Sequence, residues 1–311
     1  MMAAPNPVVR RYGMAAIDAA AAVIRGGGIV AVPTETVYGL AADAGDAAAV
    51  AHIYAAKGRP GFNPLIVHVA DLDAAEALAV FDDGARALAA AFWPGPLTLV
   101  LPLRPGAPVA SLVTAGLDTI AIRVPAGRAM RALIAASGRA LAAPSANRSN
   151  GLSPTRAAHV VASLGDAVGL VIDDGACAAG VESTIVMGRR VLRPGPVTAA
   201  MIASVVGAAD PVVDEGAIVA PGQLATHYAP GKPLRLDATE ATADEWLIGF
   251  GAVAGDDTLS ASGDLTEAAA RLFDTLHHAD ASGRPRIAVA PVPEEGIGAA
   301  INDRLRRAAT R

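Results

Sequence analysis

Residues 28–45 read GIVAVPTETVYGLAADAG, and this stretch decides the fold class because it joins a buried strand to a polar loop. The apolar run from Ile29 to Val32 predicts a core strand, which we expect Pro33 to end. The polar residues that follow are Thr34, Glu35, Thr36 and Tyr38. Ligands of α/β proteins bind where strand ends converge, so the stretch predicts both a sheet and a site beside it.

The composition predicts a protein with at least one large core and two domains. The chain has 311 residues, 53% of them hydrophobic but only 4% aromatic, so Ala, Val, Leu and Ile must build the core. No run approaches ~18 uninterrupted apolar residues, and the N-terminus lacks the order of segments in a secretion signal. Cys177, the single cysteine, excludes an intramolecular disulfide and a cysteine-based zinc site. We therefore expect a cytoplasmic protein with no membrane association.

The net charge of the chain limits the kinds of ligand that the protein is expected to bind. A formal net charge of −5 argues against a broad nucleic-acid surface, although it allows a local cationic cleft. Any bound anion must therefore be met by a few well-placed cations.

Helical and strand patterns alternate along the first two thirds of the chain. They predict an α/β domain over residues 1–206, with a mixed sheet because residues 183–192 form a hairpin pattern. Residues 207–233 are rich in Pro and Gly and predict a linker. Residues 234–311 predict a second, small α/β domain with strands at 245–250 and 286–290 and helices at 265–279 and 299–309.

The loop from Lys57 to Pro64 is the most informative of the polar stretches. Its two cations, Lys57 and Arg59, are separated by one glycine and have no acidic residue near them in sequence. A shared anion such as a phosphate chain explains the pair. The alternative is a solvated helix end at which the helix dipole favours Lys57.

Other polar residues at strand ends have both a structural and a functional interpretation. Ser145 and Asn147 suit a turn as well as a site, and Ser153 followed by a proline predicts the cap of a helix. Arg123, at the end of an apolar strand, needs a partner, and a carboxylate ligand is one candidate. His68 breaks an apolar strand, where a lone histidine is more often structural.

Several well-known catalytic signatures are absent from the sequence. There is no GxxxxGK[ST], GxGxxG, HExxH or GxSxG pattern. Nothing therefore indicates covalent catalysis or a protein-held metal. Cations and hydroxyls without an obvious nucleophile suit a reaction between two bound substrates, to which the protein contributes positioning and charge neutralisation.

Six motifs occur in the order found in the Sua5/YciO/YrdC family, which residues 10–206 resemble closely. They are PTETVYGL (33–40), the KGR loop with NPL (57–65), WPGPLT (93–98), RVP (123–125), PSAN (144–147) and RPG (193–195). Pro221-Gly222 and residues 227–230 (HYAP) resemble the linker of the two-domain Sua5 branch, although Ala220 replaces its usual serine. The resemblance implies a YrdC-like twisted mixed sheet with flanking helices around a cationic cleft, plus a small C-terminal α/β (Sua5) domain.

The activity implied by the resemblance is that of an L-threonylcarbamoyladenylate synthase, a nucleotidyltransferase. L-Threonine, bicarbonate (or CO2) and ATP give threonylcarbamoyl-AMP and pyrophosphate, and Mg2+ enters with ATP. The product serves the t6A37 modification of tRNA through a downstream threonylcarbamoyl transferase. Whether the chain also contacts tRNA directly stays open.

The resemblance also implies roles for individual residues. The implied catalytic set is Lys57, Arg59, Ser145 and Asn147. The implied L-threonine contacts are Thr34, His68, Arg123, Ala143 and Ser183. The implied ATP contacts are Arg59, Asn63, Thr119, Ser145, Ser153, Arg193 and Tyr228. Tyr228 would reach over the nucleotide from the linker, which would help to exclude water from a hydrolysable adenylate.

Two other function classes compete with this interpretation. An RNA-binding module would use the cleft without catalysis, but single-strand binders need aromatic stacking platforms and this chain has few aromatics. A carbamoyl-transfer domain of the hydrogenase-maturation type would normally accompany zinc-finger cysteines, which Cys177 alone cannot supply.

Overall fold

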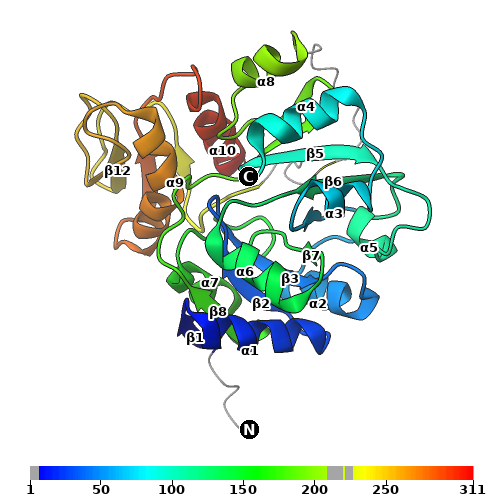
Figure 1. Ribbon diagram of the computed structural model, residues 1–311. Coiled ribbons are helices and arrows are strands. Elements are labelled where there is room, and N and C mark those ends of the chain that lie inside the picture. The colour runs from blue at the N-terminus through cyan, green and yellow to red at the C-terminus, as the bar shows by residue number, and fades with distance from the viewer. Residues whose placement is uncertain (1–6, 209–219, 221–226, 311) are drawn as a thin grey trace, which may run out of the picture.

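The computed structural model describes residues 7–208, 220 and 227–310, which form a larger and a smaller α/β unit (Figure 1). Pro221-Gly222 and most of the predicted linker lie outside these residues. The domain boundaries at 206 and 234 therefore stay a proposal. A hydrophobic core of the smaller unit extends to Leu152 and Val181 of the larger one, so apolar packing joins the two units.

The larger unit is built around a mixed sheet. Its strands are β1 (Val8–Arg11), β2 (Val30–Pro33), β3 (Tyr38–Asp43), β4 (Ile66–His68), β5 (Leu97–Pro102), β6 (Thr119–Arg123), β7 (Leu141–Ala142), β8 (Leu170–Asp173), β9 (Thr184–Met187) and β10 (Arg190–Arg193). Over the described residues they pair in the order β1-β8-β2-β3-β7-β4-β6-β5-β9-β10. Parallel and antiparallel pairs alternate irregularly, as the predicted hairpin of β9 and β10 indicated.

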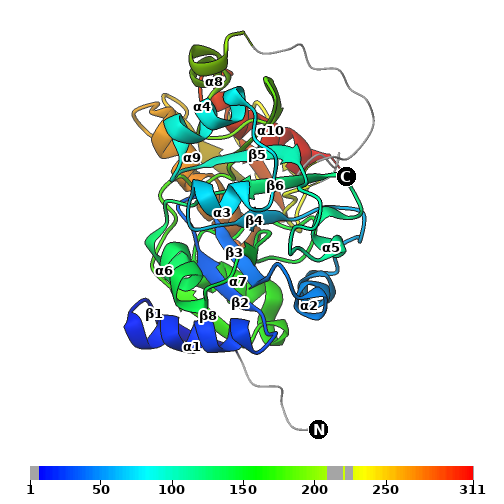
Figure 2. The same cartoon turned by 45° about the vertical axis from the view of Figure 1, so that its right-hand side comes forward.

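Helices cover both faces of this sheet (Figures 1 and 2). They are α1 (Met14–Arg25), α2 (Ala47–Lys57), α3 (Leu72–Glu76), α4 (Asp83–Phe92), α5 (Ser111–Thr114), α6 (Arg128–Ser137), α7 (Ala157–Leu164) and α8 (Ala199–Val206), with a 3-10 turn at Gly165–Ala167. Val30 and Val32 of β2 pack in the core beneath α1 and α6, whereas Ala31 between them belongs to the opposite core. This alternation follows from the two-residue period of a strand.

The opening stretch forms a hairpin, whose first strand stops at its proline and whose second strand begins at Tyr38. The expectation that the strand ends at Pro33 is confirmed, because Pro33 is the last residue of β2, where it pairs with Tyr38 of β3. Thr34 Oγ1 accepts hydrogen bonds from the backbone N–H groups of Thr36 and Val37, which closes the turn. The hairpin therefore presents the PTET residues at the ends of two interior strands of the larger sheet.

Ser153 does not cap a helix. Helix α7 begins at Ala157 after an extended Arg156, and the Pro154 carbonyl accepts a hydrogen bond from the backbone N–H of Tyr38. The Ser153 hydroxyl instead donates to a carboxylate oxygen of Glu182. A tertiary partner thus replaces the local cap that the Ser-Pro pair indicated.

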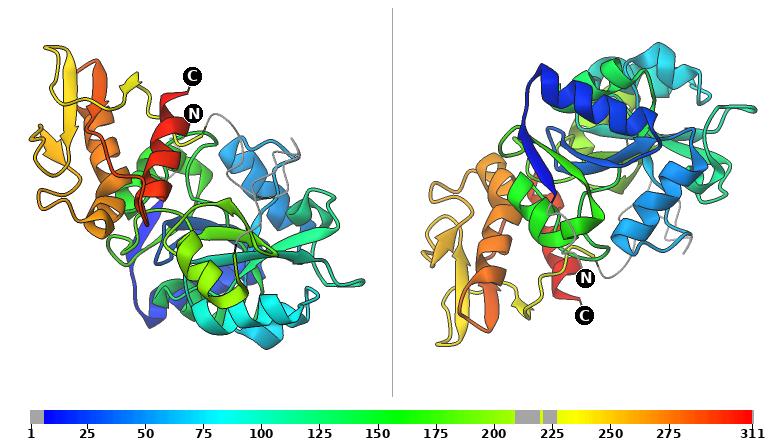
Figure 3. Two further views of the ribbon diagram at one scale, coloured as in Figure 1. Left: turned by 90° about the horizontal axis from the view of Figure 1, so that it is seen from above. Right: turned by 90° about the horizontal axis from the view of Figure 1, so that it is seen from below.

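The smaller unit has a parallel sheet with helices on the side facing the larger unit. Its strands are β11 (Leu234–Arg235), β12 (Glu245–Gly249), β13 (Asp257–Thr258) and β14 (Arg286–Val289), in the order β11-β14-β12-β13, and its helices are α9 (Leu265–Ala281) and α10 (Gly298–Ala309). Figure 3 shows the strands on the outside and the two helices turned toward the larger unit. The elements predicted here from sequence are confirmed.

Gly180 is expected to be required for the contact between the units. Its φ of +68° is strained for other residues, and a Cβ would overlap the backbone of Ala269 and Ala270 in α9. Gly180→Ala should lower the free energy of unfolding by about 1–3 kcal/mol from strain alone, and by more through the overlap. Gly188→Ala is the matched control, because Gly188 has a similar φ of +59° and open space around it. Equal losses in urea unfolding would contradict the packing described.

Candidate active site

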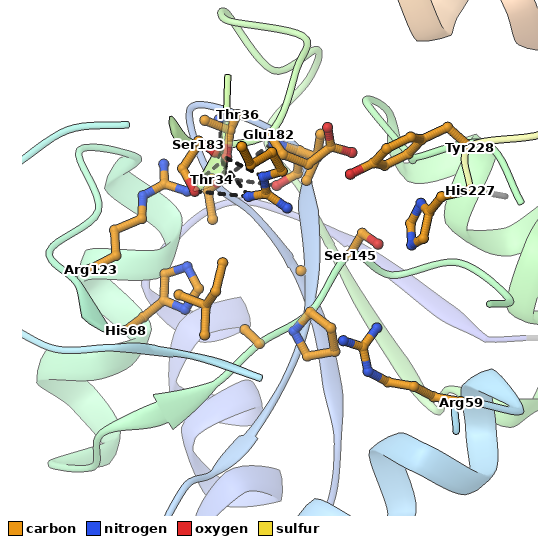
Figure 4. A pocket seen from close by; sticks show the side chains of 16 residues that line it. Thr34, Thr36, Arg59, His68, Arg123, Ser145, Glu182, Ser183, His227 and Tyr228 are labelled. Carbon is orange, nitrogen blue, oxygen red and sulfur yellow. Dashed lines mark hydrogen bonds between the residues drawn. The ribbon is translucent and has the colours of Figure 1, made fainter. Parts of the chain in front are cut away.

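A cavity lies where the β2–β3 turn, the ends of β4 and β6, and four loop segments converge (Figure 4). The space between its lining atoms amounts to about 550 Å³, part of which is open to solvent. Its lining residues are Thr34, Thr36, Val37, Gly39, Arg59, Ile66, His68, Arg123, Ala143, Pro144, Ser145, Glu182, Ser183, Arg193, His227 and Tyr228.

Most of the residues singled out from sequence meet in this cavity. Those that line it are Thr34, Arg59, His68, Arg123, Ala143, Ser145, Ser183, Arg193 and Tyr228. Those that do not line it are Lys57, Asn63, Thr119, Asn147 and Ser153. No role was assigned from sequence to Glu182 or His227, which also line the cavity, although His227 lies in the HYAP motif.

Arg123 is buried with a protein carboxylate beside it. Its Nη2 lies 2.5 Å from Glu35 Oε1, and its Nη1 donates to Thr36 Oγ1 over 2.9 Å. The Thr36 hydroxyl in turn lies 2.8 Å from that of Thr34. The partner that Arg123 needs is therefore already present in the PTET turn, which fixes its guanidinium at the cavity wall.

The carboxylate of Glu35 has both backbone and side-chain partners. Its carboxylate accepts backbone hydrogen bonds from Ala126 (3.1 Å) and Gly127 (3.0 Å) while it pairs with Arg123. Burial raises the pKa of Glu35, but the charge of Arg123 and these hydrogen bonds outweigh it and lower the pKa from 4.5 to about 2. Glu35 is thus ionised at neutral pH and orients Arg123.

The depressed pKa of Glu35 predicts an acid-dependent loss of stability. A lowered carboxyl pKa stabilises the fold at pH above about 4.5, and this contribution is lost as pH falls from about 4.5 toward 2. Glu35→Gln should therefore unfold more easily in urea at pH 7, and its disadvantage should shrink between pH 4.5 and 3. Glu76→Gln, which removes a surface partner of Arg86, should cost under about 1 kcal/mol at any pH. A disadvantage of Glu35→Gln that does not change with pH would refute the ion pair.

Lys57 holds a loop instead of facing the cavity. Only 3% of the residue is exposed, so the alternative of a solvated helix end is wrong. Its ammonium donates to the carbonyls of Ser145 and Asn147, and lies 3.3 Å from Asn147 Oδ1. Burial, and secondarily the charge of Arg59, lower the pKa of Lys57 well below its usual range. Lys57 and Arg59 therefore have different positions, and of the two it is Arg59 that lines the cavity.

Two guanidinium groups, of Arg59 and Arg193, make one end of the cavity cationic. Arg59 donates to the carbonyls of Asn63 (3.1 Å) and Pro64 (2.8 Å), and burial lowers its pKa to about 10. Arg193 donates to the Ser183 carbonyl from Nε (3.1 Å) and Nη2 (2.9 Å). Backbone anchors thus fix both groups, which suits the binding of an anion without rearrangement.

His68 lies in register with Arg123 on the neighbouring strand. Burial, helped by the charge of Arg123, lowers its pKa to about 3, so the ring is neutral at neutral pH. Its Nδ1 is buried without a hydrogen-bond partner among the described residues. The ring can therefore still offer a hydrogen bond to a ligand.

The polar groups separate into two ends of the cavity. Figure 4 shows Arg123 and His68 on one side, Arg59, His227 and Tyr228 on the other, and Ser145 between them. In the ranges 7–208, 220 and 227–310, no group of three or more His, Cys, Asp or Glu side chains could hold a metal ion. Across the same part of the chain, no helix combines the length and apolar character needed to cross a membrane.

Comparisons with known proteins cover almost the whole chain. The family model described as "Telomere recombination" (Sua5_yciO_yrdC) matches residues 22–195, and the model of the threonylcarbamoyl-AMP synthase C-terminal domain matches residues 197–310. The threonylcarbamoyl-AMP synthase of Bacillus subtilis is 40% identical over 94% of this chain and 92% of its own.

Solved structures agree with these matches. Pyrococcus abyssi Sua5 in complex with L-threonine has a TM-score of 0.87 and 37% identity, over 97% of both chains. Full-length HypF, at 18% identity and a TM-score of 0.52 over 30% of its length, shares the fold alone. The chain therefore belongs to the Sua5/YciO/YrdC family, with the C-terminal domain of threonylcarbamoyl-AMP synthases.

Proposed function

We propose that this protein is a threonylcarbamoyl-AMP synthase that uses L-threonine, bicarbonate or CO2, and ATP, and releases pyrophosphate. The observation that carries the proposal is the match, over 97% of both chains, to the Sua5 structure that holds L-threonine. The cavity has the two chemically different ends that such a reaction needs.

The end with Arg123 suits L-threonine. We assign its carboxylate to Arg123, because a buried guanidinium fixed by Glu35 can donate to a second carboxylate without moving. The neutral ring of His68, the hydroxyls of Thr34 and Ser183, and the small side chain of Ala143 would enclose the rest of the amino acid.

The end with Arg59 and Arg193 suits the triphosphate of ATP. Ser145 and Tyr228 add hydroxyls to it, and the Tyr228 oxygen is buried without a hydrogen-bond partner in the described part of the chain. Lys57 and Asn147 would act through the loop that carries Ser145, since neither lines the cavity. We keep Asn63, Thr119 and Ser153 as proposed ATP contacts that would require the nucleotide to extend beyond the cavity.

The proposed chemistry needs no nucleophile from the protein. The amine of threonine attacks the carbon of bicarbonate and water leaves, which gives a carbamate. A carbamate oxygen then attacks the α-phosphorus of ATP, and the bond to the β-phosphate breaks to release pyrophosphate. Holding the two substrates in line and neutralising charge are the contributions that the cavity can make. Mg2+ carried by ATP would supply further charge neutralisation.

The proposed product, threonylcarbamoyl-AMP, is a mixed anhydride. A downstream threonylcarbamoyl transferase would consume it for the t6A37 modification of tRNA. The enclosure of the cavity by His227 and Tyr228 would limit its hydrolysis.

Omission of single substrates tests the proposal. Pyrophosphate release by the full chain should require ATP, L-threonine and bicarbonate together, and should fall to background when any one is left out. Release that proceeds equally without threonine would contradict the proposal. Tight tRNA binding with no turnover would favour the RNA-binding alternative instead.

A further inference from the structure

Arg304 is a fully buried cation that the smaller unit inserts against the larger one. It lies in α10 with 0% of its surface exposed. Its Nε is 2.8 Å from Glu182 Oε2, and its Nη1 donates to the Pro194 carbonyl and to Asp303, each over 2.8 Å. A guanidinium so completely desolvated needs this number of partners to be tolerated.

The groups that Arg304 contacts belong to the cavity wall. Glu182 lines the cavity, and its other oxygen accepts a hydrogen bond from Ser153. Pro194 follows Arg193, which also lines the cavity. The guanidinium carbon of Arg304 lies 5.3 Å from the centre of the Tyr228 ring. One side chain of the smaller unit thus contacts three segments that carry cavity residues.

The charge of Glu182 poses a problem for a nucleotide site. Burial raises the pKa of Glu182, but the charges of Arg304 and Arg193 lower it overall, so the carboxylate is ionised. A bare carboxylate on this wall would repel a triphosphate and attract Arg193, because electrostatic interactions are strong in a poorly solvated cavity. Arg304 is hydrogen-bonded to Glu182 and carries a positive charge, but it does not itself line the cavity.

We propose that Arg304 is a positioning residue for ATP, which neutralises Glu182 and so leaves the cationic end of the cavity for the triphosphate. The smaller unit then completes the site by supplying a charge to its wall. This inference rests on the proposed synthase function. It assigns to Arg304 an effect on ATP and not on threonine, since Arg123 and His68 lie at the other end of the cavity.

A charge-repair experiment on the full chain tests this role. Arg304→Met should raise the KM for ATP by at least about tenfold, and the KM for L-threonine by less than about threefold. Adding Glu182→Gln to Arg304→Met removes the uncompensated charge and should recover most of the ATP affinity. Arg306→Met is the matched control on the same helix, because Arg306 pairs with the exposed Glu294 and should leave both KM values unchanged.

A merely structural role for Arg304 would give a different pattern. Equal rises in both KM values, or no recovery in the double variant, would overturn the inference, as would an Arg304→Met protein with unchanged ATP affinity. If Arg304→Met does not fold, the double variant and Arg304→Lys, which keeps the charge, are each compared with wild type. Charge repair predicts a KM for ATP within about threefold of wild type for both, and a rise of at least about tenfold in both would overturn the inference. Failure of the wild-type chain to release pyrophosphate would instead refute the proposed function.

Discussion

Replacing Arg123 by methionine is expected to raise the KM for L-threonine about 10- to 100-fold, while the KM for ATP changes less than about threefold. A charge-assisted hydrogen bond is worth about 1.5–3 kcal/mol, and each 1.4 kcal/mol is tenfold in affinity. The change also leaves Glu35 buried without its cation, so the PTET turn that carries Thr34 loses one of the contacts that hold it. Steady-state kinetics with each substrate varied separately measures both values.

Two variants separate the lost ligand contact from a damaged fold. Glu35→Gln combined with Arg123→Met removes the orphaned charge, and should regain stability but not threonine affinity. Arg128→Met is the control: it removes a surface ion pair with Asp174 and should leave both KM values unchanged. If Arg123→Met raises both KM values equally, the division of the cavity into two ends is wrong.

Lys57→Met is expected to reduce kcat/KM for ATP at least about 100-fold and to lower the free energy of unfolding by about 2–4 kcal/mol. The substitution leaves the carbonyls of Ser145 and Asn147 buried without their donor, and each such group costs about 1–3 kcal/mol. The loop that carries Ser145 would then no longer hold its hydroxyl at the cavity. Urea unfolding measures the loss of stability, and steady-state kinetics at varied ATP concentration measures kcat/KM.

Lys232 provides the control for Lys57, since these are the two lysines of the chain. Its ammonium also donates to backbone carbonyls, those of Ala279 and Ser282, but it does not line the cavity. Lys232→Met should therefore cost stability without weakening ATP binding. Loss of ATP affinity in Lys232→Met comparable to that in Lys57→Met would show that the effect comes from stability alone.

The fold was predictable from sequence wherever a local signal decides the structure. Helix α2 is an example, because Asp46 accepts hydrogen bonds from the backbone N–H groups of Ala48 and Ala49 at its start and Gly58 takes a left-handed conformation at its end. Ser153 was misread as a helix cap because its hydrogen bond to Glu182, a tertiary contact, outweighs the local preference.

The composition of the site was predictable, but its pairings were not. The motifs name most of the residues that line the cavity, yet the sequence does not show that Glu35 and Arg123, 88 positions apart, form an ion pair. The contact of Arg304 with Glu182 spans 122 positions and two units, so no local pattern signals it. Tertiary packing selects such partners, because a buried charge must find an opposite charge wherever the chain brings one.

The central claim is that one reaction joins threonine, bicarbonate and the adenylate of ATP. Incubation with 15N-threonine, 13C-bicarbonate and ATP, followed by mass spectrometry of the rapidly quenched mixture, tests it directly. We expect one product that contains AMP and carries both heavy isotopes, formed in equal amount to pyrophosphate. Labelled threonine found on AMP without the carbon label, or AMP and pyrophosphate released with no doubly labelled product, would contradict the account.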